Sequence, residues 1–127
     1  MANVMVVDDD DQVRGLLFRV LTADSHQVRQ AGDGQAAVDL CRADPPQLMV
    51  IDLIMPVKEG LETIRELRPQ FPDMRILAIS GGGLAGTGSY LRLAQKLGAD
   101  AVLAKPFGVD DLRSAVGGLL GKAPAGS

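Results

Sequence analysis

The chain has 127 residues, which suits one compact domain and leaves little room for a second. Apolar residues make up 46% of the chain, enough for a hydrophobic core, and the net charge of −3 comes without the Lys and Arg cluster of a nucleic-acid surface. The apolar runs are far too short to cross a membrane, no signal-peptide pattern occurs, and the single Cys41 fits a reduced compartment, so we expect a cytoplasmic protein that binds neither membrane nor DNA.

Short apolar runs alternate with amphipathic stretches along the chain. The first helix is marked by apolar residues at positions 13, 16, 17, 20 and 21, the spacing of one helical face. In chain order, the pattern predicts strand 3–8, helix 11–23, strand 26–30, helix 34–43, strand 47–52, helix 61–71, strand 74–80, helix 90–97, strand 100–104 and helix 112–120. We expect one domain over 1–121 and a C-terminal tail or linker stub over 122–127.

Five strands that alternate with five helices make a (βα)5 pattern. This order predicts an α/β fold with a parallel sheet, right-handed crossovers and helices on both faces. The strands are apolar almost throughout, as expected for a sheet that is covered on both sides. In such a doubly wound sheet, ligands bind at the carboxyl ends of the strands.

Polar side chains gather at those carboxyl ends. Four aspartates, residues 8–11, follow the first strand, Asp52 ends the third, Ser80 ends the fourth, and Lys105 follows the fifth. The second strand contributes nothing of note. Asp10 and Asp11 are predicted to be solvated residues of the first helical turn, where the helix dipole favours a negative charge.

The remaining residue types suggest a chemistry. Carboxylates without nearby His or Cys suit Mg²⁺, which takes one or two carboxylates together with phosphate oxygens. A carboxylate such as Asp52 can also attack a phosphoryl group to form an aspartyl phosphate. Lys105 could neutralise the phosphoryl oxygens, and Ser80 could form a hydrogen bond with one of them.

The motifs "VVDDD", "IDLIMP", "AIS" and "AKPF", in this order and at these strand ends, resemble a receiver domain of two-component response regulators. The resemblance covers residues 3–121 and implies a flavodoxin-like fold with strand order 2-1-3-4-5. It implies that Asp52 accepts a phosphoryl group from a histidine kinase or a histidine phosphotransfer protein. It also implies that the domain catalyses only its own phosphorylation and dephosphorylation, and so is not an enzyme in the usual sense.

The resemblance also assigns roles to the other residues. Asp9 would bind Mg²⁺ directly, Asp8 through water, and Ile54 through its backbone carbonyl, with Asp52 completing the set. Ser80 would be the hydroxyl that moves toward the phosphoryl group, and Lys105 would pair with it. In this family the bond before the following proline is often cis, so we expect a cis Lys105–Pro106 peptide.

The signal would leave through the fourth helix, fifth strand and fifth helix toward a downstream protein target. Val102 stands where the family usually has an aromatic switch residue, and whether Tyr90 replaces it is left open. Two other classes stay open from the residues themselves: an aspartate phosphatase of the haloacid dehalogenase type, with Asp8 as its nucleophile, and a binding domain that needs no phosphorylation. The donor kinase, the target, the oligomeric state, the phosphoaspartate lifetime and the choice between a stand-alone protein and an excised domain are likewise undetermined.

Overall fold

The structure is a computed structural model that describes residues 2–55, 58–80 and 87–121, with the backbone alone for 87–91. Strands and helices alternate along the whole described chain. They are β1 (Asn3–Val7), α1 (Asp11–Ala23), β2 (Gln27–Ala31), α2 (Gly34–Ala43), β3 (Leu48–Asp52), α3 (Gly60–Gln70), β4 (Arg75–Ser80), α4 (Thr87–Leu97), β5 (Ala101–Ala104) and α5 (Val109–Leu120). The predicted elements are therefore all present, with shifts of one to three residues at half of their ends.

The five strands form one parallel sheet in the order β2-β1-β3-β4-β5. This confirms the predicted α/β class, the doubly wound topology and the strand order. The order reverses between β1 and β3, where the chain passes from one half of the sheet to the other. A ligand site is expected at the carboxyl ends of the strands beside such a reversal.

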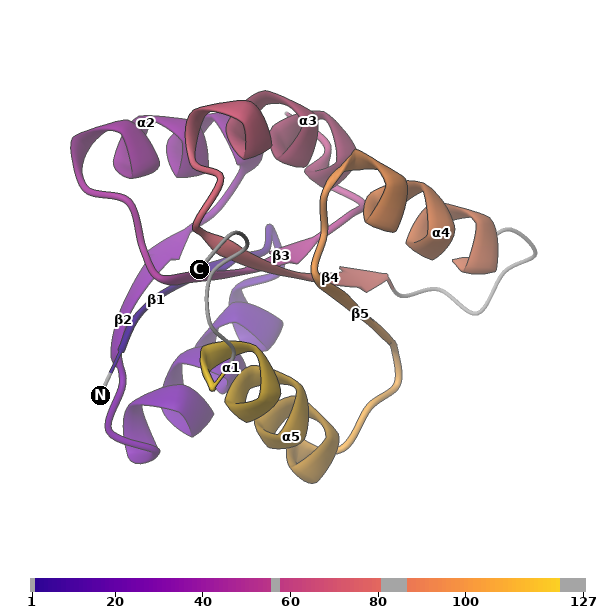
Figure 1. Cartoon of the computed structure of the whole chain (residues 1–127). Coiled ribbons are helices and arrows are strands. Elements are labelled where there is room, and N and C mark those ends of the chain that lie inside the picture. Colours follow the sequence, from indigo (N-terminus) through magenta and orange to yellow (C-terminus); the bar gives the residue numbers. More distant parts are fainter. Residues whose placement is uncertain (1, 56–57, 81–86, 122–127) are drawn as a thin grey trace.

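Helices cover both faces of the sheet, with α2, α3 and α4 on one side and α1 and α5 on the other (Figure 1). Successive strand residues point to opposite faces, so each strand contributes side chains to both hydrophobic cores. Met5, Met49 and Ile51 lie in the core beneath α2, α3 and α4. Val4 and Val50 lie in the core beneath α1 and α5. No helix in the described part of the chain is long and apolar enough to span a bilayer.

One position of the predicted core is wrong. Leu16 was expected on the buried stripe of α1, but 44% of its surface is exposed. The buried residues of this helix are Leu17, Val20 and Leu21. Leu16 lies at the edge of that narrow stripe because each residue advances the helix by about 100°.

The first residue of α3 packs directly on the backbone of the carboxyl end of β3. A Cβ atom built on Gly60 would overlap the carbonyl oxygen of Asp52 and lie 2.6 Å from the Cα of Leu53. The Gly60 N–H also donates a hydrogen bond to the Leu53 carbonyl at 2.9 Å. Only a residue without a side chain lets the helix approach Asp52 this closely.

Substitution Gly60→Ala is therefore expected to lower the free energy of unfolding by about 1–3 kcal/mol, because the added methyl group has to displace backbone atoms. Gly118→Ala is the matched control, since a Cβ on this exposed residue of α5 meets nothing within 4 Å. It should raise stability by about 0.5–1 kcal/mol through better helix propensity. Urea denaturation followed by circular dichroism measures both, and a Gly60→Ala protein as stable as the wild type would contradict the close approach.

Candidate functional site

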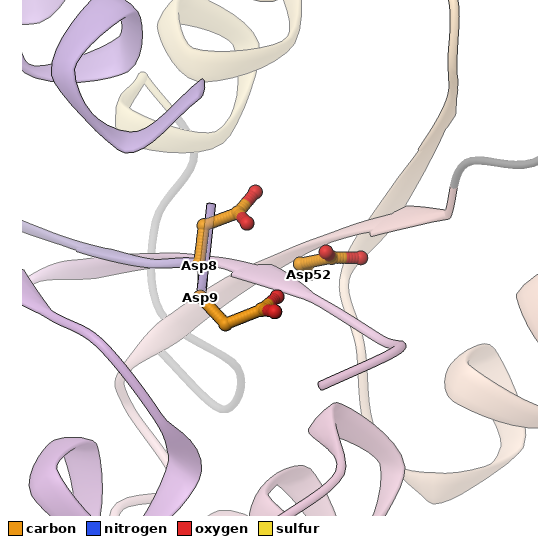
Figure 2. Close-up of side chains that lie close together, drawn as sticks. All are labelled: Asp8, Asp9 and Asp52. Atoms are coloured by element: carbon orange, nitrogen blue, oxygen red, sulfur yellow. The ribbon is translucent and has the colours of Figure 1, made fainter. Parts of the chain in front are cut away.

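Two neighbouring strands bring the acidic residues together. Val7 of β1 pairs with Ile51 of β3, so the residues that follow them, Asp8 and Asp52, lie next to each other at the edge of the sheet. The carboxylates of Asp8, Asp9 and Asp52 each place an oxygen within 4.8 Å of the others. Figure 2 shows these three side chains gathered at the ends of the two strands. The predicted acidic cluster is thus assembled by strand register.

The three carboxylates differ in their exposure to solvent. Asp8 and Asp52 are buried, with 1% and 7% of their surfaces exposed, while Asp9 is exposed. Backbone N–H groups donate to both buried side chains, from Asp10 to Asp8 Oδ1 at 2.9 Å and from Ile54 to Asp52 Oδ1 at 3.2 Å. These bonds fix one oxygen of each carboxylate and leave the other, Oδ2, to face a cation.

Lys105 supplies a cation to both buried carboxylates. Its Nζ lies 3.6 Å from Asp8 Oδ2 and 3.7 Å from Asp52 Oδ2. The residue follows β5, and its backbone N–H donates to the Ser80 carbonyl at 2.8 Å. The Lys105–Pro106 peptide is cis, as the family resemblance implies. One ammonium therefore serves two carboxylates, and the group of Asp8, Asp9, Asp52 and Lys105 stays net negative when ionised.

The pKa values of the buried carboxyl groups reflect this incomplete compensation. Burial, and then the nearby charge of Asp8, raise the pKa of Asp52 to about 6, although Lys105 and the Ile54 N–H act in the opposite direction. Burial also raises the pKa of Asp8, against the Asp10 N–H and Lys105. Both shifts show that charge at these positions is costly in the absence of a further cation.

Ser80 ends β4 beside this group. Its side chain is fully buried, and its Oγ has no hydrogen-bond partner among the described residues. Buried hydroxyl groups nearly always have a hydrogen-bond partner, so this Oγ is available to bind a polar group at the edge of the sheet. The Lys105 backbone N–H donates to the Ser80 carbonyl, so the two residues lie at the same edge of the sheet.

The run of four aspartates divides as the sequence predicted, with one refinement. Asp10 is the N-cap of α1, and its side chain accepts hydrogen bonds from the backbone N–H groups of Gln12 and Val13. Asp11 lies in the first turn and forms an ion pair with Arg14. Neither carboxylate belongs to the acidic cluster, so only Asp8 and Asp9 face Asp52.

The second strand contributes a residue that the sequence did not indicate. The prediction that β2 adds nothing of note is wrong, because Gln30 of β2 accepts a hydrogen bond from Arg14 Nε at 3.2 Å. Arg14 in turn donates to the Asp8 carbonyl at 2.7 Å. The sequence signal was weak, because an arginine six residues after Asp8 looks like any solvated residue on an amphipathic helix.

Three predicted features are either outside the described side chains or not tested by the structure. Tyr90 lies in α4, but its side chain is not among those described, so its role stays a prediction. Val102 of β5 is half-buried and packs against the core under α2, α3 and α4. The side chain of Ile54 is exposed, and its backbone N–H donates a hydrogen bond to the Asp52 carboxylate. The backbone carbonyl predicted to bind the metal belongs to this same residue.

A groove of about 550 Å³ lies at the opposite edge of the sheet, away from these residues. It is lined near the starts of β3 and β4 by residues such as Gln47, Phe71 and Arg75, and by Leu120 at the end of α5. None of the predicted site residues lines it. The acidic edge is therefore defined by its charges and hydrogen bonds, and the groove plays no part in it.

Comparison with known families bears on the interpretations that the residues left open. The family model of the response regulator receiver domain matches residues 4–117. The chain belongs to this family. A receiver domain is the phosphoacceptor module of two-component signalling, and this membership favours the receiver interpretation over the phosphatase alternative.

Similar proteins agree with this assignment. The response regulators MprA of Mycolicibacterium vanbaalenii and Mycobacterium tuberculosis are 37% and 36% identical over 117 residues, 92% of this chain. The chain spans about half the length of these relatives, 49% and 50%. The solved receiver domain of NtrX from Brucella abortus is 27% identical with a TM-score of 0.88, covering 94% of this chain and 99% of that one. The receiver domain of the Francisella response regulator 1452 is 26% identical with a TM-score of 0.83, covering 94% and 96%.

The raised pKa of Asp52 predicts that Asp52→Asn stabilises the metal-free receiver domain near neutral pH. The folded protein binds the Asp52 proton more tightly than the unfolded chain, so the ionised group weakens the fold above pH about 6 and this penalty is gone below pH about 4. We expect a gain of about 1–3 kcal/mol at pH about 7.5 that disappears at pH about 4. Urea denaturation in the presence of a chelator measures it.

Asp73→Asn is the matched control, because Asp73 is an exposed aspartate far from the acidic cluster. It should leave the stability at both pH values within about 0.5 kcal/mol of the wild type. Equal effects of the two substitutions, or a loss of stability in Asp52→Asn at neutral pH, would contradict the unfavourable charge at Asp52.

Proposed function

We propose that this receiver domain accepts a phosphoryl group on Asp52, in a Mg²⁺-dependent reaction, from a phosphohistidine of a histidine kinase or a histidine phosphotransfer protein. The observation that carries the proposal is the position of Lys105 Nζ, within 3.7 Å of an oxygen of both Asp8 and Asp52 at the carboxyl edge of the sheet. A nucleophilic carboxylate, a further acidic residue and a fixed cation are thus gathered at one point. Family membership supports the choice of Asp52 over Asp8 as the acceptor.

The donor set fits Mg²⁺. Asp8, Asp9 and Asp52 offer carboxylate oxygens within 4.8 Å of one another, and no nitrogen or sulfur ligand lies among them. Hard oxygen donors of this kind are what Mg²⁺ prefers. These three side chains and the Ile54 backbone carbonyl would hold the ion, with Asp9 bound directly and Asp8 through water. When bound, Mg²⁺ supplies positive charge that offsets the negative charge of the carboxylates and of the phosphoryl oxygens.

The chain's own groups account for the remaining parts of the transfer. An oxygen of the Asp52 carboxylate forms a bond to phosphorus while the bond from phosphorus to the donor imidazole nitrogen breaks, and its electron pair stays on the imidazole. A pKa of about 6 leaves most of Asp52 ionised at neutral pH, so the nucleophile is available. Lys105 pairs with a phosphoryl oxygen, and the Ser80 hydroxyl donates a hydrogen bond to another.

We further propose that the phosphorylated domain signals by protein contact through α4, β5 and α5. Leu93 of α4 supports this, because 44% of this apolar side chain is exposed to solvent. The domain would catalyse only its own phosphorylation and dephosphorylation and act in the cytoplasm, with residues 1–121 as the receiver unit and 122–127 as a tail or linker.

Incubation with acetyl phosphate and Mg²⁺ tests the acceptor directly. The wild type should gain about 80 Da, the mass of one phosphoryl group, in intact-protein mass spectrometry. Asp52→Asn should gain nothing because the amide cannot form the acyl phosphate, and a chelator should abolish the wild-type adduct. The matched control Asp73→Asn should be modified like the wild type.

A phosphoryl adduct that survives Asp52→Asn would contradict the proposal. A phosphoryl adduct on Asp8 would instead favour an aspartate phosphatase of the haloacid dehalogenase type. A wild-type protein that binds Mg²⁺ and never gains the phosphoryl mass would favour a domain that acts without phosphorylation.

Ser80→Ala tests the role of the unpaired hydroxyl. Because Ser80 Oγ has no partner among the described residues, its removal should leave the stability of the unphosphorylated protein within about 1 kcal/mol of the wild type. The phosphoaspartate, however, should form more slowly, by about tenfold, because one hydrogen bond to the phosphoryl group is lost. Ser80→Thr should restore the rate, and equal rates for alanine and serine would exclude a role for the hydroxyl.

A further inference from the structure

Arg14 joins three separate parts of the fold around the acidic edge. Its Nη1 donates to the Asp8 carbonyl at 2.7 Å, its Nε donates to Gln30 Oε1 at 3.2 Å, and its Nη2 pairs with the Asp11 carboxylate. These partners belong to the turn after β1, to β2 and to the first turn of α1. The guanidinium is well suited to this task because its donors point in fixed directions within one plane.

The three bonds are not of equal weight. Asp11 is solvent-exposed, with 86% of its side-chain surface accessible, so its ion pair with Arg14 contributes little. The bond to the Asp8 carbonyl is partly buried, and a charged donor makes it stronger than a neutral hydrogen bond. The Arg14 side chain is itself only 19% exposed. Its main contact is therefore the backbone of the turn that carries Asp8 and Asp9.

Residues of β2 stabilise this turn through both backbone groups of Asp8, its N–H and its carbonyl. The Asp8 N–H donates to the Ala31 carbonyl at 3.2 Å, and the Asp8 carbonyl accepts from Arg14, which Gln30 holds in place. Ala31 and Gln30 are the last two residues of β2. The edge strand thus fixes the turn twice, once through its backbone and once through Arg14.

We propose that Arg14 is a positioning residue for cation binding: it holds the Asp8–Asp9 turn in the arrangement that binds the divalent cation, and Gln30 orients Arg14. The proposal rests on the proposed function, since it concerns the same cation. Two adjacent carboxylates repel each other and the buried Asp52, so a turn without this restraint would spend part of its time in other arrangements. The apparent affinity for the cation is proportional to the fraction of molecules whose turn keeps the binding arrangement, so a tenfold loss of affinity means that this fraction falls about tenfold.

Mg²⁺ binding measured by isothermal titration calorimetry tests the proposal. Arg14→Met keeps most of the aliphatic stem and removes every donor, and its dissociation constant for Mg²⁺ should rise about tenfold. Arg14→Lys keeps the charge without the planar donors, so it should resemble Arg14→Met more than the wild type. Gln30→Ala changes no charge and should give a smaller rise, of about two- to threefold.

Arg19→Met is the matched control, since it removes the same charge from an exposed position of the same helix. It should leave the Mg²⁺ dissociation constant within about twofold of the wild type, because exposed charges are screened by solvent and salt. Equal effects of Arg14→Met and Arg19→Met would overturn the proposal and leave only a general charge effect. Should Arg14→Met fail to fold, an unchanged Mg²⁺ affinity in both Arg14→Lys and Gln30→Ala overturns it.

The Mg²⁺ dependence of phosphorylation by acetyl phosphate separates positioning from a loss of stability. In Arg14→Met, the Mg²⁺ concentration at half-maximal rate should rise about tenfold, while the rate at saturating Mg²⁺ stays within about twofold of the wild type. A lower saturating rate with unchanged Mg²⁺ dependence would overturn the positioning role. A wild type that binds no Mg²⁺ overturns the proposed function itself, whereas normal wild-type behaviour with unaffected Arg14 variants overturns only this inference.

Discussion

The ammonium group of Lys105 lies between two buried carboxylates, and the chemistry of this receiver domain depends on that arrangement. Asp8 and Asp52 are like charges held side by side out of water, and neither could stay ionised without a cation nearby. One lysine offsets them only in part, and the pKa of each stays above its ordinary value. A divalent cation bound at this edge would neutralise the uncompensated charge, so the free-energy cost of holding both carboxylates ionised would become affinity for the ion.

The fold produces this arrangement with few residues. Pairing of β1 with β3 sets Asp8 beside Asp52, and the backbone bond from Lys105 to Ser80 holds the lysine over the same edge. Because Gly60 has no side chain, α3 packs directly against the Asp52 carbonyl, and this contact restrains the end of β3. Each of these three contacts is made by the backbone. The positions of the charged side chains therefore follow from the strand pairing and from the packing of α3 on β3.

Most of this could be predicted from the sequence because it follows from topology. Parallel strands end at one edge, so the (βα)5 order places Asp8, Asp52 and Lys105 along that edge, and the strand order implied by the family resemblance brings them together. The link from Arg14 to Gln30 could not be predicted, since it depends on how α1 is rotated over β1 and β2. The prediction that Leu16 is buried was wrong for a similar reason. Periodicity gives the apolar face of a helix, but it does not give the width of the stripe that the sheet covers.

The most direct test of this account is the pKa of the Asp52 carboxyl group, followed by carbon-13 NMR of its side chain through a pH titration of the metal-free protein. We expect a pKa of about 6, because burial and Asp8 outweigh Lys105. Saturating Mg²⁺ should then shift the titration to well below that value, since a bound cation favours the ionised carboxylate. An ordinary aspartate pKa near 4 in the metal-free protein, unchanged by Mg²⁺, would contradict the account.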